Sequence, residues 1–173
     1  DAGLIYWFRR TGGDEFQSAQ LLKTADGEPL QPAQCATAFA VDWDNDGDLD
    51  LLVGSADGKI FLVSNGGSAI SEGFAAPQIL QVDGKPIEYE MRDSSPIAAD
   101  WDGDGLLDVL TGTQDGQVLW FRNAGRPGQP RLTAAQVLVP KSRLGWGDDR
   151  QRQETDWGMR TKVCAADFNG DGR

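Results

Sequence analysis

The 173-residue chain contains no histidine, only two cysteines, and no apolar run long enough to cross a membrane. Without histidine, these residues cannot form a histidine-based catalytic triad. Basic residues are also fewer than acidic ones, 16 against 27, which gives a formal net charge of −11. With no basic stripe to offset this charge, the chain is not expected to bind nucleic acid.

A nine-residue acidic motif carries much of that charge. It reads Asp-Trp-Asp-Asn-Asp-Gly-Asp-Leu-Asp over 42–50 and Asp-Trp-Asp-Gly-Asp-Gly-Leu-Leu-Asp over 100–108, and it begins again at 167. Carboxylates at positions 1, 3, 5 and 9 surround a glycine at position 6, which permits a sharp backbone turn. Such a set of oxygens suits Ca²⁺, which takes about six to eight oxygen ligands. We therefore predict calcium loops.

The backbone carbonyl of position 7 can supply a further oxygen in each loop. The predicted metal ligands are Asp42, Asp44, Asp46, Asp48, Asp50, Asp100, Asp102, Asp104, Leu106, Asp108, Asp167, Asn169 and Asp171. Asn169 removes one charge from the third loop, in which position 9 is missing, so whether that loop holds an ion stays open. Eleven of the 27 acidic residues lie in the three loops, so the acidity reflects metal-ligand density.

Two other kinds of loop carry similar acidic residues. An EF-hand needs a glutamate at position 12 and two flanking helices, but position 12 is Val53 or Thr111 and the flanks are short apolar runs typical of strands. An acidic turn without a metal would explain one copy. It is a poorer explanation for a motif that returns at corresponding places.

The sequence repeats with a period of 58 residues, so that 36–67 aligns with 94–125 without a gap. Each unit is expected to hold four strands. The expected ranges are 37–43, 49–55, 59–64 and 78–82 in the first unit, and 96–101, 107–113, 117–122 and 136–139 in the second. The Asp-Gly pairs at 57–58 and 115–116 are expected to form tight hairpin turns with positive φ values. Four antiparallel strands that repeat radially predict the blade of a β-propeller.

The predicted fold class is all-β, a propeller segment of about three blade-equivalents. Residues 1–35 would end a preceding blade, and 36–93 would form a complete blade. Residues 94–162 would form a second blade with a long connector at 140–162, and 163–173 would begin the next. Neighbouring blades of a larger propeller are expected to lie outside this sequence, because a complete propeller has at least about four blades.

The stretches 40–54 and 97–112 resemble FG-GAP/VCBS repeats, the calcium-loop blades of integrin α-subunit propellers and of many secreted bacterial proteins. The resemblance covers nearly the whole chain, and the Trp-Phe-Arg ending of the third strand is closer to the bacterial type. It implies about seven blades, with Ca²⁺ held between the first and second strands. Calcium loops of this kind often need about millimolar Ca²⁺, which favours an extracellular, cell-surface or periplasmic location.

The connector 140–162 is expected on the face opposite the calcium loops. It holds a candidate surface for a glycan or protein partner, because tryptophan and arginine are enriched in binding hot spots. Its candidate residues are Trp146, Arg150, Arg152 and Trp157. The alternative, a solvated loop whose tryptophans pack on the next blade, stays open.

Other residues have structural interpretations. Packing between blades would explain the aromatic pairs at 7–8 and 120–121, and the loop tryptophans at 43 and 101 are expected to point away from the ion. Arg122 is expected to cover a strand end or pair with loop acids. Cys164 is expected to be a small buried thiol, because it aligns with core positions of the other units.

These residues favour a recognition or scaffold module over an enzyme. Nearly all the paired acids are accounted for as calcium ligands, and a carboxylate that binds Ca²⁺ is a poor general acid. The alternative is the propeller part of a secreted polysaccharide-degrading lyase or hydrolase.

Overall fold

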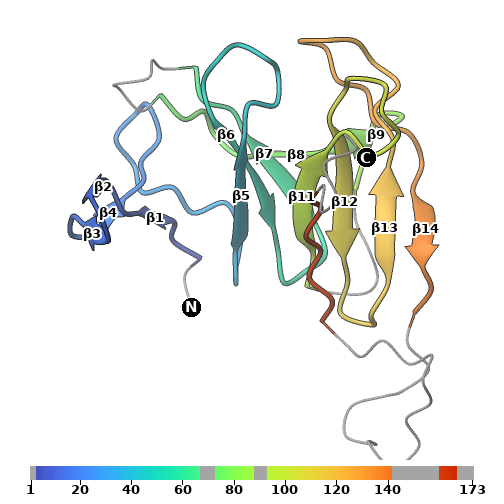
Figure 1. The fold of residues 1–173 in the computed structure, drawn as a ribbon, viewed down its shortest axis with the longest axis horizontal. Helices are drawn as coiled ribbons and strands as arrows, with labels where there is room; N and C mark the ends of the chain where they lie inside the picture. The colour runs from blue at the N-terminus through green and yellow to red at the C-terminus, as the bar shows by residue number, and fades with distance from the viewer. Residues whose placement is uncertain (1–2, 67–72, 88–92, 142–159, 167–173) are drawn as a thin grey trace, which may run out of the picture.

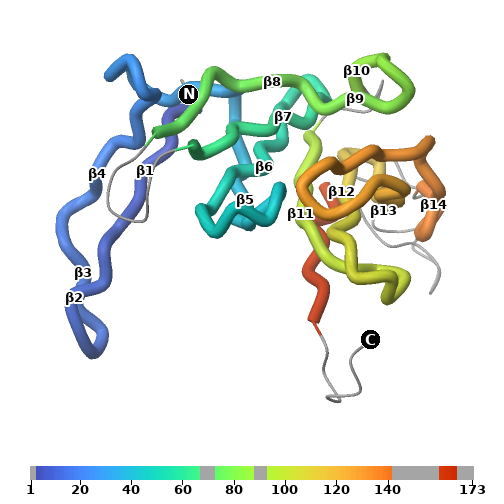
Figure 2. The backbone as a smooth tube through the Cα atoms, turned by 90° about the horizontal axis from the view of Figure 1, so that it is seen from above, coloured from blue at the N-terminus to red at the C-terminus, as the bar shows by residue number. Residues whose placement is uncertain are grey.

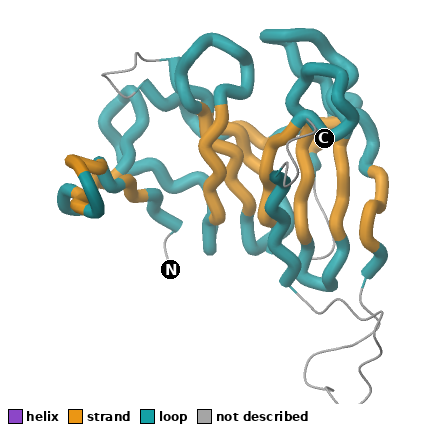
Figure 3. The backbone as a smooth tube through the Cα atoms, in the orientation of Figure 1, coloured by secondary structure: helices purple, strands orange, loops and turns teal. Residues whose placement is uncertain are grey.

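The computed structural model of the chain describes residues 3–66, 73–87, 93–141 and 160–166. These residues form strands and loops without a helix (Figure 3). The strands are β1 (Tyr6–Trp7), β2 (Arg10–Gly12), β3 (Glu15–Phe16), β4 (Gln20–Leu21), β5 (Thr37–Val41), β6 (Asp50–Gly54), β7 (Ile60–Val63), β8 (Gln78–Ile79), β9 (Gln81–Val82), β10 (Lys85–Pro86), β11 (Ser95–Ala99), β12 (Asp108–Gly112), β13 (Val118–Phe121) and β14 (Gln136–Val139). Across the described ranges, no helix could span a membrane.

Two four-stranded antiparallel sheets dominate the fold, in the orders β5-β6-β7-β8 and β11-β12-β13-β14 (Figure 1). Each sheet places its strands in chain order, as a propeller blade does. The prediction of an all-β chain built from four-stranded blades is therefore confirmed. We call these sheets the first and second blade.

The two blades share one hydrogen-bond register. Thr37 pairs with Gly54 in the first blade, and Ser95 pairs with Gly112 in the second. Each residue of one pair lies 58 positions from its counterpart, so the sequence repeat is also a repeat of the strand pairing.

In the first blade, β6 is buried on both faces, because its successive side chains point alternately into two hydrophobic cores. Leu52 belongs to a cluster between the blades that includes Trp43, Val109 and Phe121. Leu51 and Val53 belong to a second cluster with Leu22 and Leu30, which lie in the segment after β4. Apolar burial on both sides thus fixes the first blade between its neighbours.

The N-terminal segment pairs β1 with β4 and β2 with β3, beside the first blade. Trp7 packs against the cluster on this side, as predicted. Phe8 is 58% exposed, so the prediction that it packs between blades is wrong. It follows Trp7 in the chain, and its side chain therefore projects to the opposite side, where the described residues leave most of it exposed.

The predicted fourth strand of the first blade is divided. β8 pairs with β7, whereas β9 pairs with β10 in a separate hairpin. This hairpin extends from the first blade over the second (Figure 2), and Ile87 just after it joins the core between the blades.

The Asp-Gly hairpins differ from the predicted turn type. Only Gly58 and Gly116 have positive φ, 85° and 88°, and the aspartates before them do not. The amide of Gly58 donates to Ser55 O (3.1 Å), and Ser55 N donates to Lys59 O (3.2 Å), which closes a three-residue loop ending in a left-handed glycine. The Ser55 hydroxyl donates to Asp57 Oδ1 (2.5 Å) and holds the aspartate in the turn.

The blades meet at a close backbone contact. A Cβ atom at Gly54 would lie 2.1 Å from Ser94 O, and a Cβ atom at Gly112 would lie 1.8 Å from Thr161 O. Ser94 N donates to Ser55 O (3.1 Å), and Thr161 N donates in the same way to Thr113 O (3.2 Å). We call this arrangement the blade junction. It occurs twice because both glycines occupy the same repeat position.

Both cysteines are free and exposed, so the prediction of a buried thiol at Cys164 is wrong. Residues 161–166 follow the second blade junction but pair with no described strand. Nothing among the described residues therefore covers the thiol in the way that neighbouring strands cover Ile97, its counterpart in the second blade.

Candidate metal centres

Both acidic loops lie at the same end of the two blades, between the first and second strand of each (Figure 1). The Asp-Gly hairpins close the opposite ends of the central strands. Among the described residues, the fold therefore separates the acidic loops at one end of the blades from the Asp-Gly hairpins at the other.

The first loop is shaped by hydrogen bonds to its own side chains. Asp42 accepts the amides of Asp46 and Gly47, both at 3.1 Å, and Asp46 accepts the amide of Asp48 at 2.9 Å. Gly47 and Asn45 have φ values of 95° and 63°, in the left-handed region that glycine and asparagine tolerate best. The sequence Asn-Asp-Gly thus permits the tight turn around the loop.

Asp50, at position 9, joins the loop to the blade. Its carboxylate is 1% exposed and accepts the amides of Asn65 (2.7 Å) and Trp43 (2.9 Å). Burial raises the pKa of Asp50 above its ordinary value, these two hydrogen bonds oppose the rise, and Asp44 and Asp46 add to it by repulsion. The ionised carboxylate would therefore be stabilised by a nearby cation.

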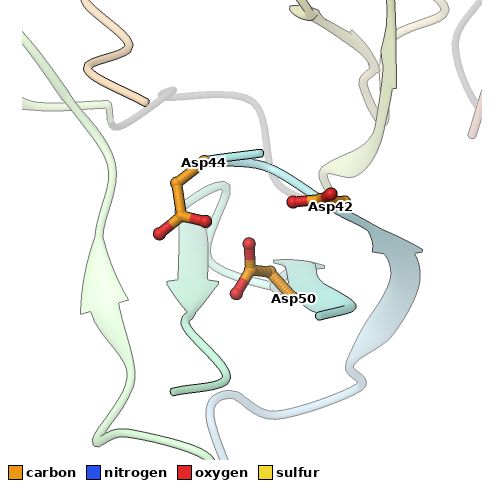
Figure 4. Close-up of side chains that lie close together, drawn as sticks. All are labelled: Asp42, Asp44 and Asp50. Carbon is orange, nitrogen blue, oxygen red and sulfur yellow. The ribbon is translucent and has the colours of Figure 1, made fainter. Parts of the chain in front are cut away.

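Asp42, Asp44 and Asp50 bring one carboxylate oxygen each to within 4.8 Å of one another. Figure 4 shows the three carboxylates pointing toward a common space. Asp44 Oδ1 is buried and has no hydrogen-bond partner among the described residues. Three converging carboxylates with an unpartnered buried oxygen fit a divalent cation of the Ca²⁺ type, which binds to oxygen ligands.

The second loop repeats this turn. Asp100 accepts the amides of Gly103 (2.9 Å), Asp104 (3.0 Å) and Gly105 (2.9 Å), and Asp104 accepts the amide of Leu106 (2.9 Å). Asp100, Asp102 and Asp104 bring their oxygens within 4.8 Å of one another. The second loop therefore also gathers three carboxylates, but not the same three positions as the first.

Asp108, at position 9 of the second loop, is fully buried. It accepts the amides of Asn123 (2.7 Å) and Trp101 (3.3 Å) and the indole N–H of Trp120 (2.8 Å). Burial raises its pKa, and these hydrogen bonds oppose the rise. This aspartate therefore anchors its loop to β13 and to Asn123 just beyond it, and it lies outside the converging group.

A guanidinium group lies at the second loop. Arg122 Nε donates to Asp102 Oδ2 (2.5 Å) and Arg122 Nη2 donates to Asp104 Oδ2 (2.9 Å). The hydrogen bond to Asp102 raises the pKa of Arg122 above its ordinary value. The prediction that Arg122 pairs with loop acids is confirmed.

The loop tryptophans differ in their surroundings. Trp43 is 6% exposed and lies in the core between the blades, whereas Trp101 is 49% exposed. Trp43 lies in sequence between the candidate ligands Asp42 and Asp44. Its side chain packs in the core that the first blade shares with the second, and it therefore links the first loop to the second blade.

The remaining predicted ligands either do not join the two converging groups or lie outside the described residues. The side chains of Asp46, Asp48 and Asp108 and residue Leu106 are not in the converging groups. Asp167, Asn169 and Asp171 lie outside the described residues, as do the candidate partner-binding residues Trp146, Arg150, Arg152 and Trp157.

Sequence reasoning missed the indole of Trp120 as a hydrogen-bond donor to the second loop. A signal was available, because Trp120 and Arg122 alternate along one strand and project to the same side.

Four-stranded antiparallel blades that repeat with an acidic loop between their first and second strands define a protein of the β-propeller type. The FG-GAP-like repeat family matches residues 42–111 and 100–173, which together cover more than half of the chain. The chain therefore belongs to the FG-GAP-like repeat family. No curated protein and no solved structure matches it.

Proposed function

We propose that this chain is part of an extracellular β-propeller whose acidic loops bind Ca²⁺ and whose opposite face binds a glycan or a protein. The observation that carries the calcium assignment is the convergence of Asp42, Asp44 and Asp50, with one buried Asp44 oxygen that no group in the described part of the chain hydrogen-bonds. A bound Ca²⁺ ion would supply the positive charge that these carboxylates lack. In the second loop, Asp100, Asp102 and Asp104 would hold the ion.

Calcium in this proposal acts through stability. An ion that binds only the folded loop raises the free energy of unfolding by about 1.4 kcal/mol per site when its concentration is about ten times its dissociation constant. Membership of the FG-GAP-like repeat family supports an extracellular location. So does the expected need of such loops for about millimolar Ca²⁺, a concentration typical of extracellular modules.

The melting temperature of the full-length protein is expected to rise with Ca²⁺ and to rise less in Asp44→Ala and in Asp102→Ala. Each substitution removes one carboxylate from a converging group, so each should remove the contribution of one site. Differential scanning calorimetry across a Ca²⁺ titration that starts in chelator measures this. Mg²⁺ should give a smaller shift, because it keeps several of its waters and demands a stricter geometry.

Asp14→Ala is the matched control, since it removes one exposed carboxylate from the turn between β2 and β3, away from both loops. It should leave the calcium-dependent shift unchanged. A melting temperature that ignores Ca²⁺ in the wild-type protein would contradict the calcium assignment. The argument for an extracellular location would lose its main physical support as well.

Partner binding is proposed for the connector 140–162, whose residues 142–159 lie outside the described residues. Trp146→Ala and Trp157→Ala are expected to weaken binding to a glycan array or to an immobilised protein partner by at least about tenfold, the loss typical of a tryptophan hot spot. Their melting temperatures at saturating Ca²⁺ should stay within a few degrees of wild type. Unchanged binding in both variants would refute this surface.

The same protein is then incubated with the polysaccharides that it binds. A recognition or scaffold module should release no new reducing ends and no unsaturated sugars. Cleavage of any of these polysaccharides would instead support the alternative of a degrading enzyme.

A further inference from the structure

The two acidic loops differ in the side chains that the third strand of each blade places beside them. In the first blade, Leu62 pairs with Leu52, and in the second blade Trp120 pairs with Leu110 at the same register. Two residues further along, the first blade has Ser64 and the second has Arg122. The second blade thus has an indole donor and a cation at positions where the first has an alkyl group and a hydroxyl.

Both of the side chains that distinguish the second blade from the first contact the second acidic loop. Trp120 Nε1 donates to Asp108 Oδ2, and Arg122 donates to Asp102 and Asp104. Asp104 then has both oxygens engaged, because Oδ1 accepts the amide of Leu106. In the first loop, by contrast, Asp44 keeps a buried oxygen to which no residue in the described ranges donates a hydrogen bond.

The charges differ in the same direction. The first loop carries five aspartates, and the second carries four, two of which are paired with the Arg122 guanidinium. A guanidinium group a few ångströms from a bound divalent ion repels that ion. The guanidinium must also give up its hydrogen bonds to the carboxylate oxygens before the ion can bind them. The same guanidinium holds the loop together when no ion is bound.

Resting on the proposed calcium role, we infer that Arg122 is an internal counter-cation of the second loop. It keeps that loop ordered without Ca²⁺ and makes its affinity for the ion lower than that of the first loop. The two loops therefore fill at different Ca²⁺ concentrations, the first before the second. A propeller of this kind would have one blade that depends on calcium and a neighbour that depends on it much less.

Hydrogen–deuterium exchange measured by mass spectrometry tests this in the full-length protein, because peptides over 42–50 and 100–108 report each loop separately. Across a Ca²⁺ titration, the first loop should gain protection at a Ca²⁺ concentration about tenfold lower than the second, as expected for one nearby like charge. In chelator, the second loop should exchange more slowly than the first.

Arg122→Ser gives the second blade the residue that the first blade has. It should move the midpoint of the second loop about tenfold toward lower Ca²⁺ and speed its exchange in chelator. The reciprocal Ser64→Arg should move the midpoint of the first loop toward higher Ca²⁺. Arg10→Ser, which changes the net charge equally at a turn whose guanidinium donates to Gly13 O, should move neither midpoint.

An unchanged second-loop midpoint in Arg122→Ser, or a shift to higher Ca²⁺, overturns the inference, because Arg122 would then be a bystander or would orient the ligands. Both results would leave the calcium proposal standing, since the loops would still respond to the ion. A wild-type protein in which neither loop gains protection with Ca²⁺ overturns both.

Discussion

Replacing Trp43 with alanine is expected to lower the free energy of unfolding by about 3–5 kcal/mol, the range for removing a buried tryptophan. Its side chain is 6% exposed and lies in the core shared by Leu52 of the first blade and Val109 and Phe121 of the second. The substitution would leave a cavity between the blades, and it would release the first acidic loop from the core that fixes it. Urea denaturation of the full-length protein in saturating Ca²⁺, followed by circular dichroism, measures the loss.

Leu49→Ala in the same loop is the control, because Leu49 is mostly exposed. It should change the free energy of unfolding by no more than about 0.5 kcal/mol, as surface substitutions usually do. A Trp43→Ala variant as stable as Leu49→Ala would mean that the loop tryptophan does not hold the two blades together.

Gly54→Ala is expected to destabilise the protein by about 1–3 kcal/mol, the usual cost of adding a group where a well-packed structure has no room. The new Cβ atom would lie 2.1 Å from Ser94 O and 2.6 Å from Pro96 Cδ, so the first strand of the second blade would have to move. This displacement would weaken the hydrogen bond from Ser94 N to Ser55 O. The melting temperature is the measurement.

Gly66→Ala separates this steric effect from the general consequences of replacing glycine. No atom of the described residues lies within 4 Å of a Cβ at Gly66, and its φ is not in the left-handed region. The substitution should be neutral or stabilise the protein by up to about 1 kcal/mol through the lower entropy of the unfolded chain. Equal losses in the two variants would contradict the close contact at the blade junction.

The blade architecture could be predicted because the strands, their order and the acidic loops all repeat with one period. Gly54 and Gly112, for example, lie 58 residues apart and end equivalent strands. Such repeated residues indicate both the fold and the positions of the loops. The convergence of Asp42 and Asp44 also follows from local spacing, because the two lie two residues apart and Asp42 accepts the amides of Asp46 and Gly47 in the turn that follows.

What the sequence could not show depends on contacts between residues that are distant along the chain. The amide of Asn65 donates to Asp50 fifteen residues earlier, so position 9 is a buried anchor as well as a candidate ligand. The hydrogen bond from Trp120 to Asp108 could not be predicted for the same reason, because the two residues lie twelve positions apart. The exposure of Cys164 depends on which strands lie beside it in space, and the alignment of Cys164 with Ile97 does not show which strands those are.

The blade junction has a consequence for how such a chain changes over generations. Gly54 with Ser94, and Gly112 with Thr161, use the same backbone bond and the same close approach to connect one unit to the next. A tandem duplication or deletion of one 58-residue unit would therefore recreate the existing contact at its boundary, with no second mutation needed to accommodate it. Gene segments of this kind can lengthen or shorten in whole units, and the number of blades becomes a heritable variable that selection can act on.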